Sequence, residues 1–91
     1  MMMKELYRCF GIAVRQARDA RQWSQEVLAE KANLNRSYIG EIERGKVIPS
    51  LVTMEKLSQA LGLRMSELLA RCEDVRHAQA MQKMSLVAIA C

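Results

Sequence analysis

The sequence has few of the residues that support β-sheet folds or metal sites. Only four of its 91 residues are aromatic and only one is proline, which favours a helical core of aliphatic side chains over a β-sandwich. The three cysteines (Cys9, Cys72 and Cys91) are far apart, and His77 is the only histidine, so we expect no structural zinc. Reduced thiols are expected, with Cys9 and Cys72 packed as small hydrophobic side chains. A redox switch is the alternative.

The sequence also lacks long hydrophobic runs and catalytic motifs. Polar residues follow the initial methionines, and the apolar run at residues 86–90 is far too short to span a bilayer. No nucleophile–base pair, set of paired carboxylates or phosphate-binding glycine loop is present. These absences predict a cytoplasmic protein that is not an enzyme, with no membrane contact, no cofactor, no metal and no small-molecule substrate.

Charge and length restrict the class further. Fourteen Lys and Arg residues against ten Asp and Glu residues give a net charge of +4, which mildly favours a polyanionic partner. A chain of 91 residues is long enough for one small domain, and its modest core would gain stability from dimerisation.

The most informative stretch predicts a helix, a tight turn and a second helix. The two helices are expected over residues 25–32 and 36–44. Ser24 and Asn35 are suited to cap their N-termini, and Asn33 is suited to the positive φ that ends the first. Two short helices so close together must cross steeply, as in a DNA-binding helix-turn-helix.

Three further helices are expected around this pair, over residues 4–21, over residues 51–61, and from residue 65 or 66 to about residue 71 or beyond. Ser50 is suited to cap the second of these, and Gly62 to end it. Apolar residues recur at helical spacing throughout. The predicted core comprises Leu6, Phe10, Ala13, Val14, Ala17, Trp23, Val27, Leu28, Ala32, Leu34, Tyr38, Ile39, Ile42, Leu51, Met54, Leu57, Leu61, Leu68 and Leu69.

We expect a domain over residues 1–72 and a C-terminal extension over residues 73–91. Apolar residues recur at every third position of the extension, which predicts an additional helix. These residues are Val75, Ala78, Met81 and Met84. The apolar run at its end would promote association or aggregation if it were exposed. We therefore expect it to pack, with a dimer interface as the favoured place; packing on its own domain and disorder are the alternatives.

Five motifs together cover roughly residues 5–70. They are Phe-Gly-x-x-Val-Arg-x-x-Arg (10–18), Trp-Ser-Gln-Glu-x-Leu-Ala (23–29), Tyr-Ile-x-x-Ile-Glu-Arg-Gly (38–45), Pro-Ser-Leu (49–51) and Ala-Leu-Gly (60–62). In combination they resemble the lambda-repressor-like helix-turn-helix family, also called the Xre or Cro/cI family. Two positions depart from its pattern: Asn33 stands where the family usually has Gly, and Arg64 where it usually has Ser or Thr.

The resemblance implies a compact, all-α, five-helix fold whose third helix, 36–44, enters the major groove of double-stranded DNA. It also implies a transcriptional regulator, in our interpretation a repressor, that binds a pseudo-palindromic operator as a homodimer. Restriction–modification controller proteins are similar in size and over residues 33–39. An alternative from another class is an antitoxin- or adaptor-type interaction module that uses the C-terminal extension.

A helical wheel divides the second helix of the pair into two faces. Tyr38, Ile39 and Ile42 gather on one face, towards the core. The other face carries no large apolar side chain, and it holds our candidates for contact with DNA bases. They are Arg36, Ser37, Gly40 and Glu41. Arg36 is the leading candidate, because its fork can bond guanine O6 and N7 together.

Phosphate contacts should position the domain on the duplex. Gln25 begins a helix, where free N–H groups attract anions, and by the resemblance it also braces the recognition helix near Arg36. By the resemblance, too, Arg18 and Glu43 form a partly buried ion pair between the first and third helices; separate solvated charges are the alternative. The full set of candidates for phosphate contact is Gln25, Asn35, Arg44, Lys46 and Arg18.

Overall fold

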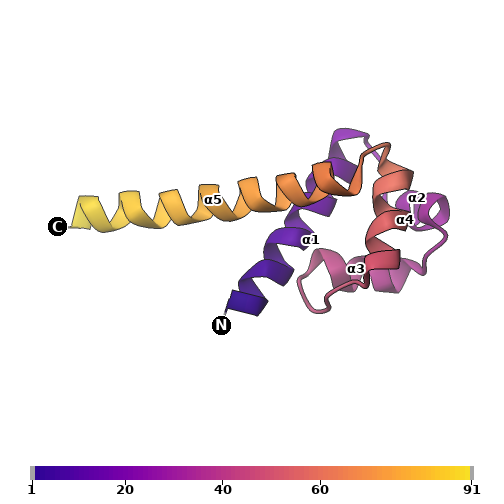
Figure 1. Cartoon of the computed structure of the whole chain (residues 1–91), viewed down its shortest axis with the longest axis horizontal. Coiled ribbons are helices and arrows are strands. Elements are labelled where there is room, and N and C mark those ends of the chain that lie inside the picture. Colours follow the sequence, from indigo (N-terminus) through magenta and orange to yellow (C-terminus); the bar gives the residue numbers. More distant parts are fainter. Residues whose placement is uncertain (1, 91) are drawn as a thin grey trace.

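The computed structural model describes the backbone of residues 2–90 and the side chains of residues 4–82. Its elements are α1 (Met2–Ala20), α2 (Gln25–Ala32), α3 (Arg36–Glu43), α4 (Leu51–Leu61) and α5 (Met65–Ala90). Four helices and the start of α5 gather into one body, from which the rest of α5 projects as a rod (Figure 1). The molecule therefore measures 49 × 25 × 22 Å. The expected all-α, five-helix fold is confirmed.

Local capping sets the helix boundaries. The Ser24 hydroxyl accepts a hydrogen bond from the N–H of Val27 at 3.1 Å, and Asn35 Oδ1 accepts one from the N–H of Ser37 at 2.7 Å. Asn33 has a φ of 55°, in the left-handed region, and ends α2. These three capping predictions are confirmed. The expected cap and end of α4 are confirmed as well, at Ser50 and Gly62.

The core lies between all five helices: α1 packs on α3 and α5, α2 packs on α3 and α4, and α4 packs on α5. Most predicted core residues are buried or partly buried there. Three were wrong, because Leu6, Leu51 and Leu69 are 38%, 64% and 41% exposed. Leu69 follows the buried Leu68, and neighbouring residues on a helix point about 100° apart, so only one of them faces the core. Leu6 and Leu51 lie towards the N-terminal ends of α1 and α4, where the core no longer covers the helix.

A glycine allows α1 and α3 to meet at their backbones. A β-carbon at Gly11 would collide with the Ile42 carbonyl oxygen and would lie 2.8 Å from the Glu43 carbonyl oxygen. Only a residue without a side chain allows this approach. The contact holds the C-terminal end of α3 against α1, and thereby orients the opposite face of α3 outward.

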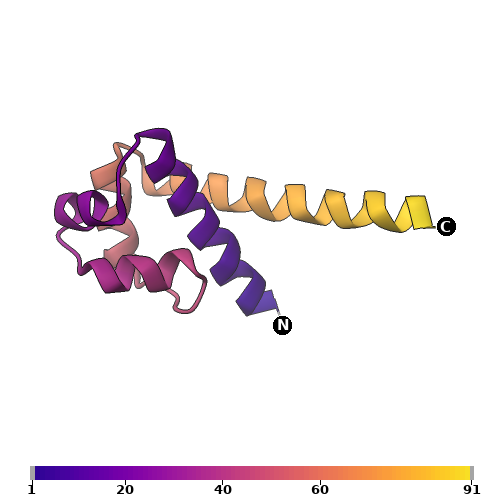
Figure 2. The ribbon, with the colours of Figure 1, turned by 180° about the vertical axis from the view of Figure 1, so that it is seen from behind.

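The extension differs from the prediction in one respect: it does not form a separate helix. Residues 73–90 continue α5 without a break (Figure 2), so the expected boundary at residue 72 lies inside one helix. Val75 packs against the core. Residues 83–91, with the apolar run and Met84, lie outside the residues whose side chains are described. Among the described residues, no helix is long and apolar enough to cross a membrane.

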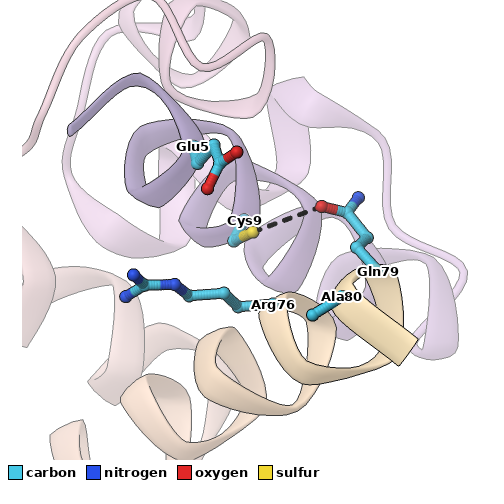
Figure 3. Close-up of a pocket in the computed structure, with 5 residues that line it drawn as sticks. All are labelled: Glu5, Cys9, Arg76, Gln79 and Ala80. Carbon is cyan, nitrogen blue, oxygen red and sulfur yellow. Dashed lines mark hydrogen bonds between the residues drawn. The ribbon is translucent and has the colours of Figure 1, made fainter. Parts of the chain in front are cut away.

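The first part of the extension packs against α1. A cavity of about 290 Å³ lies between the two helices, and Figure 3 shows side chains of both around it. The Cys9 thiol donates a hydrogen bond to Gln79 Oε1 at 3.5 Å. Cys9 and Cys72 are both buried and unpaired, as expected, and burial raises the pKa of each thiol above its ordinary value. The contacts between α5 and α1 thus continue beyond residue 72, as far as Gln79.

Candidate nucleic-acid interface

A polar hollow of about 370 Å³ opens over the outer side of α3 and the N-terminus of α2. It contains all four of the expected base-contacting residues and two of the expected phosphate-contacting ones. We call this surface the α3 face; it is lined by Gln25, Arg36, Ser37, Gly40, Glu41 and Arg44. Six of the residues that the sequence predicts to contact DNA therefore lie together on one side of the molecule.

Arg36 stands at the N-terminal end of the α3 face with its side chain 61% exposed. Its Nε lies 3.9 Å from Glu26 Oε1, and Glu26 is itself well exposed. An exposed ion pair of this length contributes little stability, so the guanidinium is free to exchange Glu26 for another acceptor. Glu26 was not predicted as a neighbour of Arg36, because the sequence alone does not place a residue of α2 beside α3.

Gly40 is buried, although the helical wheel placed it on the open side of α3. Two long polar side chains cover it. A β-carbon at Gly40 would lie 3.0 Å from Arg44 Nη1 and 3.7 Å from Gln25 Oε1. The wheel counted only apolar side chains, so it did not detect coverage by polar ones.

Behind the α3 face, Arg18 and Glu43 form a buried ion pair. Arg18 Nε lies 2.7 Å from Glu43 Oε2, and Nη2 lies 2.9 Å from Oε1, with the side chains 11% and 3% exposed. Arg18 Nη1 also donates to the Trp23 carbonyl oxygen at 2.7 Å. The hydrogen bonds that Arg18 donates to the Glu43 carboxylate raise the pKa of Arg18 above its ordinary value. The structure thus brings these two residues together in the arrangement that the resemblance implied.

Gln25 links α2 to the same carboxylate. Its Nε2 donates to Glu43 Oε1 at 3.1 Å, whereas the resemblance placed its contact near Arg36. Glu43 therefore receives hydrogen bonds from both α1 and α2. α3 is thus held from two sides, and these hydrogen bonds fix the orientation of the α3 face.

The remaining candidates lie around the α3 face. Asn35 is exposed and its side chain caps α3, while Lys46 is exposed in the loop after α3. Arg18 differs from both, since its guanidinium is directed into the protein. Among residues 4–82, no cluster of His, Cys, Asp and Glu is arranged to hold a metal ion.

A family model for helix-turn-helix proteins matches residues 14–68. The Control protein C.BamHI of Bacillus amyloliquefaciens is 48% identical over 61 residues, which are 66% of this chain and 75% of that protein. The crystal structure of the restriction-modification controller protein C.AhdI from Aeromonas hydrophila has a TM-score of 0.67 and 44% identity, and the match covers 68% of this chain and 94% of that one.

A phage protein is also similar, over a longer stretch. The Immunity repressor protein of Bacillus phage phi105 is 40% identical over 70 residues, 77% of this chain. The match takes in 49% of the phage protein, so this chain spans about half the length of that relative. The family model covers the helix-turn-helix, the part that carries the α3 face.

Proposed function

Since this chain belongs to the lambda-repressor-like helix-turn-helix family of DNA-binding transcriptional regulators, we propose that it is a repressor that binds a pseudo-palindromic operator as a homodimer. The α3 face carries the proposal. It is open and polar, it rests on a rigid support, and its helix has the dimensions that the major groove admits.

In this proposal α3 reads base edges. Arg36 binds a guanine through O6 and N7, a contact that provides about 1–3 kcal/mol of discrimination. Ser37 donates to a base edge or a phosphate, and Glu41 accepts from a cytosine N4. Gly40 contributes no side-chain atom, so its part is to shape the surface.

Phosphate contacts come from the rim. The N–H groups that open α2 at Gln25 remain available to an anion while its side chain holds Glu43. Asn35 and Lys46 lie in the segments that flank α3, and each contact that neutralises a phosphate adds about 0.9 to the salt dependence of binding. We leave Arg18 out of this set, because its donors are directed to Glu43 and Trp23.

The extension supplies the dimer contact in this proposal. α5 projects well beyond the body of the domain (Figure 1), and such a helix gains stability by packing on a second copy. Two domains joined in this way would place their α3 helices on half-sites about one helical turn apart. The site of action would be the compartment that holds the DNA, the cytoplasm.

A controller of a restriction–modification system is the second candidate. It is supported by the 48% and 44% identity to the control protein C.BamHI and to C.AhdI. Both candidates use the same surface and the same DNA-binding mechanism. They differ only in the genes that they regulate.

Selection of bound duplexes from a random DNA pool tests the proposal. The full-length chain should enrich inverted half-sites about one turn apart. Arg36→Ala should relax the preference at one base pair in each half-site by about 5- to 150-fold. Arg71→Ala is the matched control, because Arg71 is exposed on α5 beside Gln16 of α1. Recovery of no motif from the wild-type chain would refute the proposal.

A further inference from the structure

The geometry of Gly40 points to a specificity-determining role for Arg44, which the sequence analysis had assigned to a phosphate. We propose that Arg44 reads a base edge in the major groove, and that Gly40 lacks a side chain so that the Arg44 guanidinium can lie over it. The inference rests on the proposed function and adds one reading residue to the α3 face.

The first step is the position of the guanidinium. Residues 40 and 44 are four apart and so lie one above the other on the same side of α3. Arg44 Nη1 lies 3.0 Å from the place where a β-carbon at Gly40 would stand, and Arg44 Cζ lies 3.7 Å from it. Arg44 has therefore turned back along the helix by one turn. Its charge lies in the α3 face and not in the loop that follows.

The second step is that, within residues 4–82, whose side chains are described, no hydrogen bond or ion pair holds the Arg44 guanidinium, whereas Arg15, Arg18 and Arg36 each contact a carboxylate. The Arg44 side chain is exposed, while its own backbone N–H is hydrogen-bonded to the Gly40 carbonyl oxygen at 3.0 Å. The guanidinium is thus placed by a fixed backbone and by the space over Gly40, with its donors open to a ligand.

Gln25 limits the same space from the side of α2. Its Oε1 lies 3.7 Å from the β-carbon position at Gly40, and its Nε2 is held by Glu43. Of the Arg44 and Gln25 groups, only Arg44 Nη1 lies closer to that position than a β-carbon ordinarily allows, while the Gln25 amide is at ordinary contact distance. An alanine would therefore displace the end of Arg44 slightly, since that flexible end gives way more easily than the backbone of α3.

The location favours a base over a phosphate. The space over Gly40 is at the middle of the α3 face, in the hollow that Ser37 also lines. In a helix-turn-helix the N-terminal residues of the recognition helix contact base edges, and the turn back over Gly40 brings the Arg44 guanidinium one helical turn nearer to that end. Phosphates line the rims of the groove, within reach of Lys46 and the start of α2. An arginine in the middle presents a planar fork to guanine O6 and N7, as Arg36 does nearer the N-terminus.

Two substitutions separate these roles. Arg44→Lys keeps the charge, and so a phosphate contact, but it removes the bidentate fork. Gly40→Ala keeps Arg44 and displaces it, while alanine is the better helix former. Affinities would be measured on the duplex that the wild-type chain selects and on its single base-pair variants. Melting temperatures by circular dichroism would accompany each measurement.

We expect one base preference, distinct from the one assigned to Arg36, to fall by about 5- to 150-fold in Arg44→Lys. Gly40→Ala should relax the same position, with a melting temperature equal to or above that of the wild type. In an Arg44→Ala background, Gly40→Ala should have no further effect on binding, because the displaced group is absent.

Three results would overturn the inference. Retention of every base preference in Arg44→Lys would show that Arg44 contacts a phosphate. Unchanged base preferences in a folded Gly40→Ala variant would show that Gly40 does not position Arg44. If Gly40→Ala does not fold, Arg44→Lys still tests whether Arg44 contacts a base. A wild-type chain that selects no motif would refute the proposed function and this inference together, whereas the first two results refute this inference alone.

Discussion

The carboxylate of Glu43 connects three helices. It belongs to α3 and accepts hydrogen bonds from Arg18 of α1 and Gln25 of α2. The carboxylate is almost fully covered, so its charge depends on these partners for stability. Removal of one partner of a buried pair leaves the other charge uncompensated, which costs more than the pair itself contributes.

Arg18→Ala should therefore lower the free energy of unfolding by about 3–5 kcal/mol. Urea denaturation of wild type and variant would measure the difference. Arg15→Ala is the control, because Arg15 pairs with Asp19 at 3.7 Å with both side chains more than half exposed. That variant should change stability by less than about 0.5 kcal/mol. Equal free energies of unfolding for Arg18→Ala and wild type would show that the ion pair does not stabilise the fold.

The sequence predicts residue roles well where the cause is local. Ser24, Asn33 and Asn35 act through backbone groups within a few positions, so their capping roles follow from residue type and order. Coverage of Gly40 depends on side chains from α2 and from the next turn of α3. A pattern of apolar positions contains no information about such polar coverage, and the burial of Gly40 therefore had to be observed.

The relation between α1 and α3 determines how the α3 face is presented. The two helices approach so closely at Gly11 that backbone atoms of α3 occupy the place of a side chain. An added methyl group cannot be accommodated by a rotamer change, because carbonyl oxygens are held by the helix. The helices would have to separate, and the contact between Arg18 and Glu43 would be stretched with them.

Gly11→Ala should accordingly destabilise the fold, by about 1–3 kcal/mol for overpacking. Gly40→Ala is the matched control, since it is the same change within another helix but displaces only the ends of flexible side chains. There the ordinary gain of about 0.5–1 kcal/mol for replacing a helical glycine should appear. Thermal unfolding would show opposite shifts in melting temperature. A shift of the same sign in both would contradict the close-approach argument.

The sequence predicted that each helix exists, but it was less accurate about which side chains of a helix are buried and where the helix ends. Periodicity indicated every helix of the domain because each presents apolar residues to the core, and capping residues marked the ends of α2, α3 and α4. It failed for Leu69, which is adjacent to a buried leucine, and for Leu51, which begins α4 beyond the edge of the core. It also missed the continuity of α5, because Glu73 and Asp74 interrupt the apolar pattern without interrupting the helix.

At the scale of the whole molecule, α5 divides into two parts with different surroundings. Up to about residue 80 it packs on α1 and the core, through Val75 and Gln79. Beyond that point it projects away from the other helices (Figures 1 and 2). The sequence alone suggested a division at residue 72. In the structure, α5 stops packing on α1 at about residue 80. A truncation that tests the dimer must therefore end after this residue.

A chain ending at Gln82 should keep its fold and lose its partner. Every residue named in the core remains in it, so its melting temperature measured in dilute solution should stay close to that of the full chain. Sedimentation equilibrium should show a shift from dimer to monomer. Affinity for a duplex with two half-sites should fall by roughly 10²-fold or more, because the half-sites would then be bound independently.

A chain ending at Cys72 supplies the contrast. It lacks Val75 and Gln79, so it exposes the side of α1 that α5 covers, and it should unfold at a lower temperature whatever its oligomeric state. Loss of dimerisation in that chain alone would therefore say nothing about the interface, since unfolding would explain it. If the chain ending at Gln82 remains a dimer with full-length affinity, the interface lies on the domain itself, and the projecting end of α5 serves another partner.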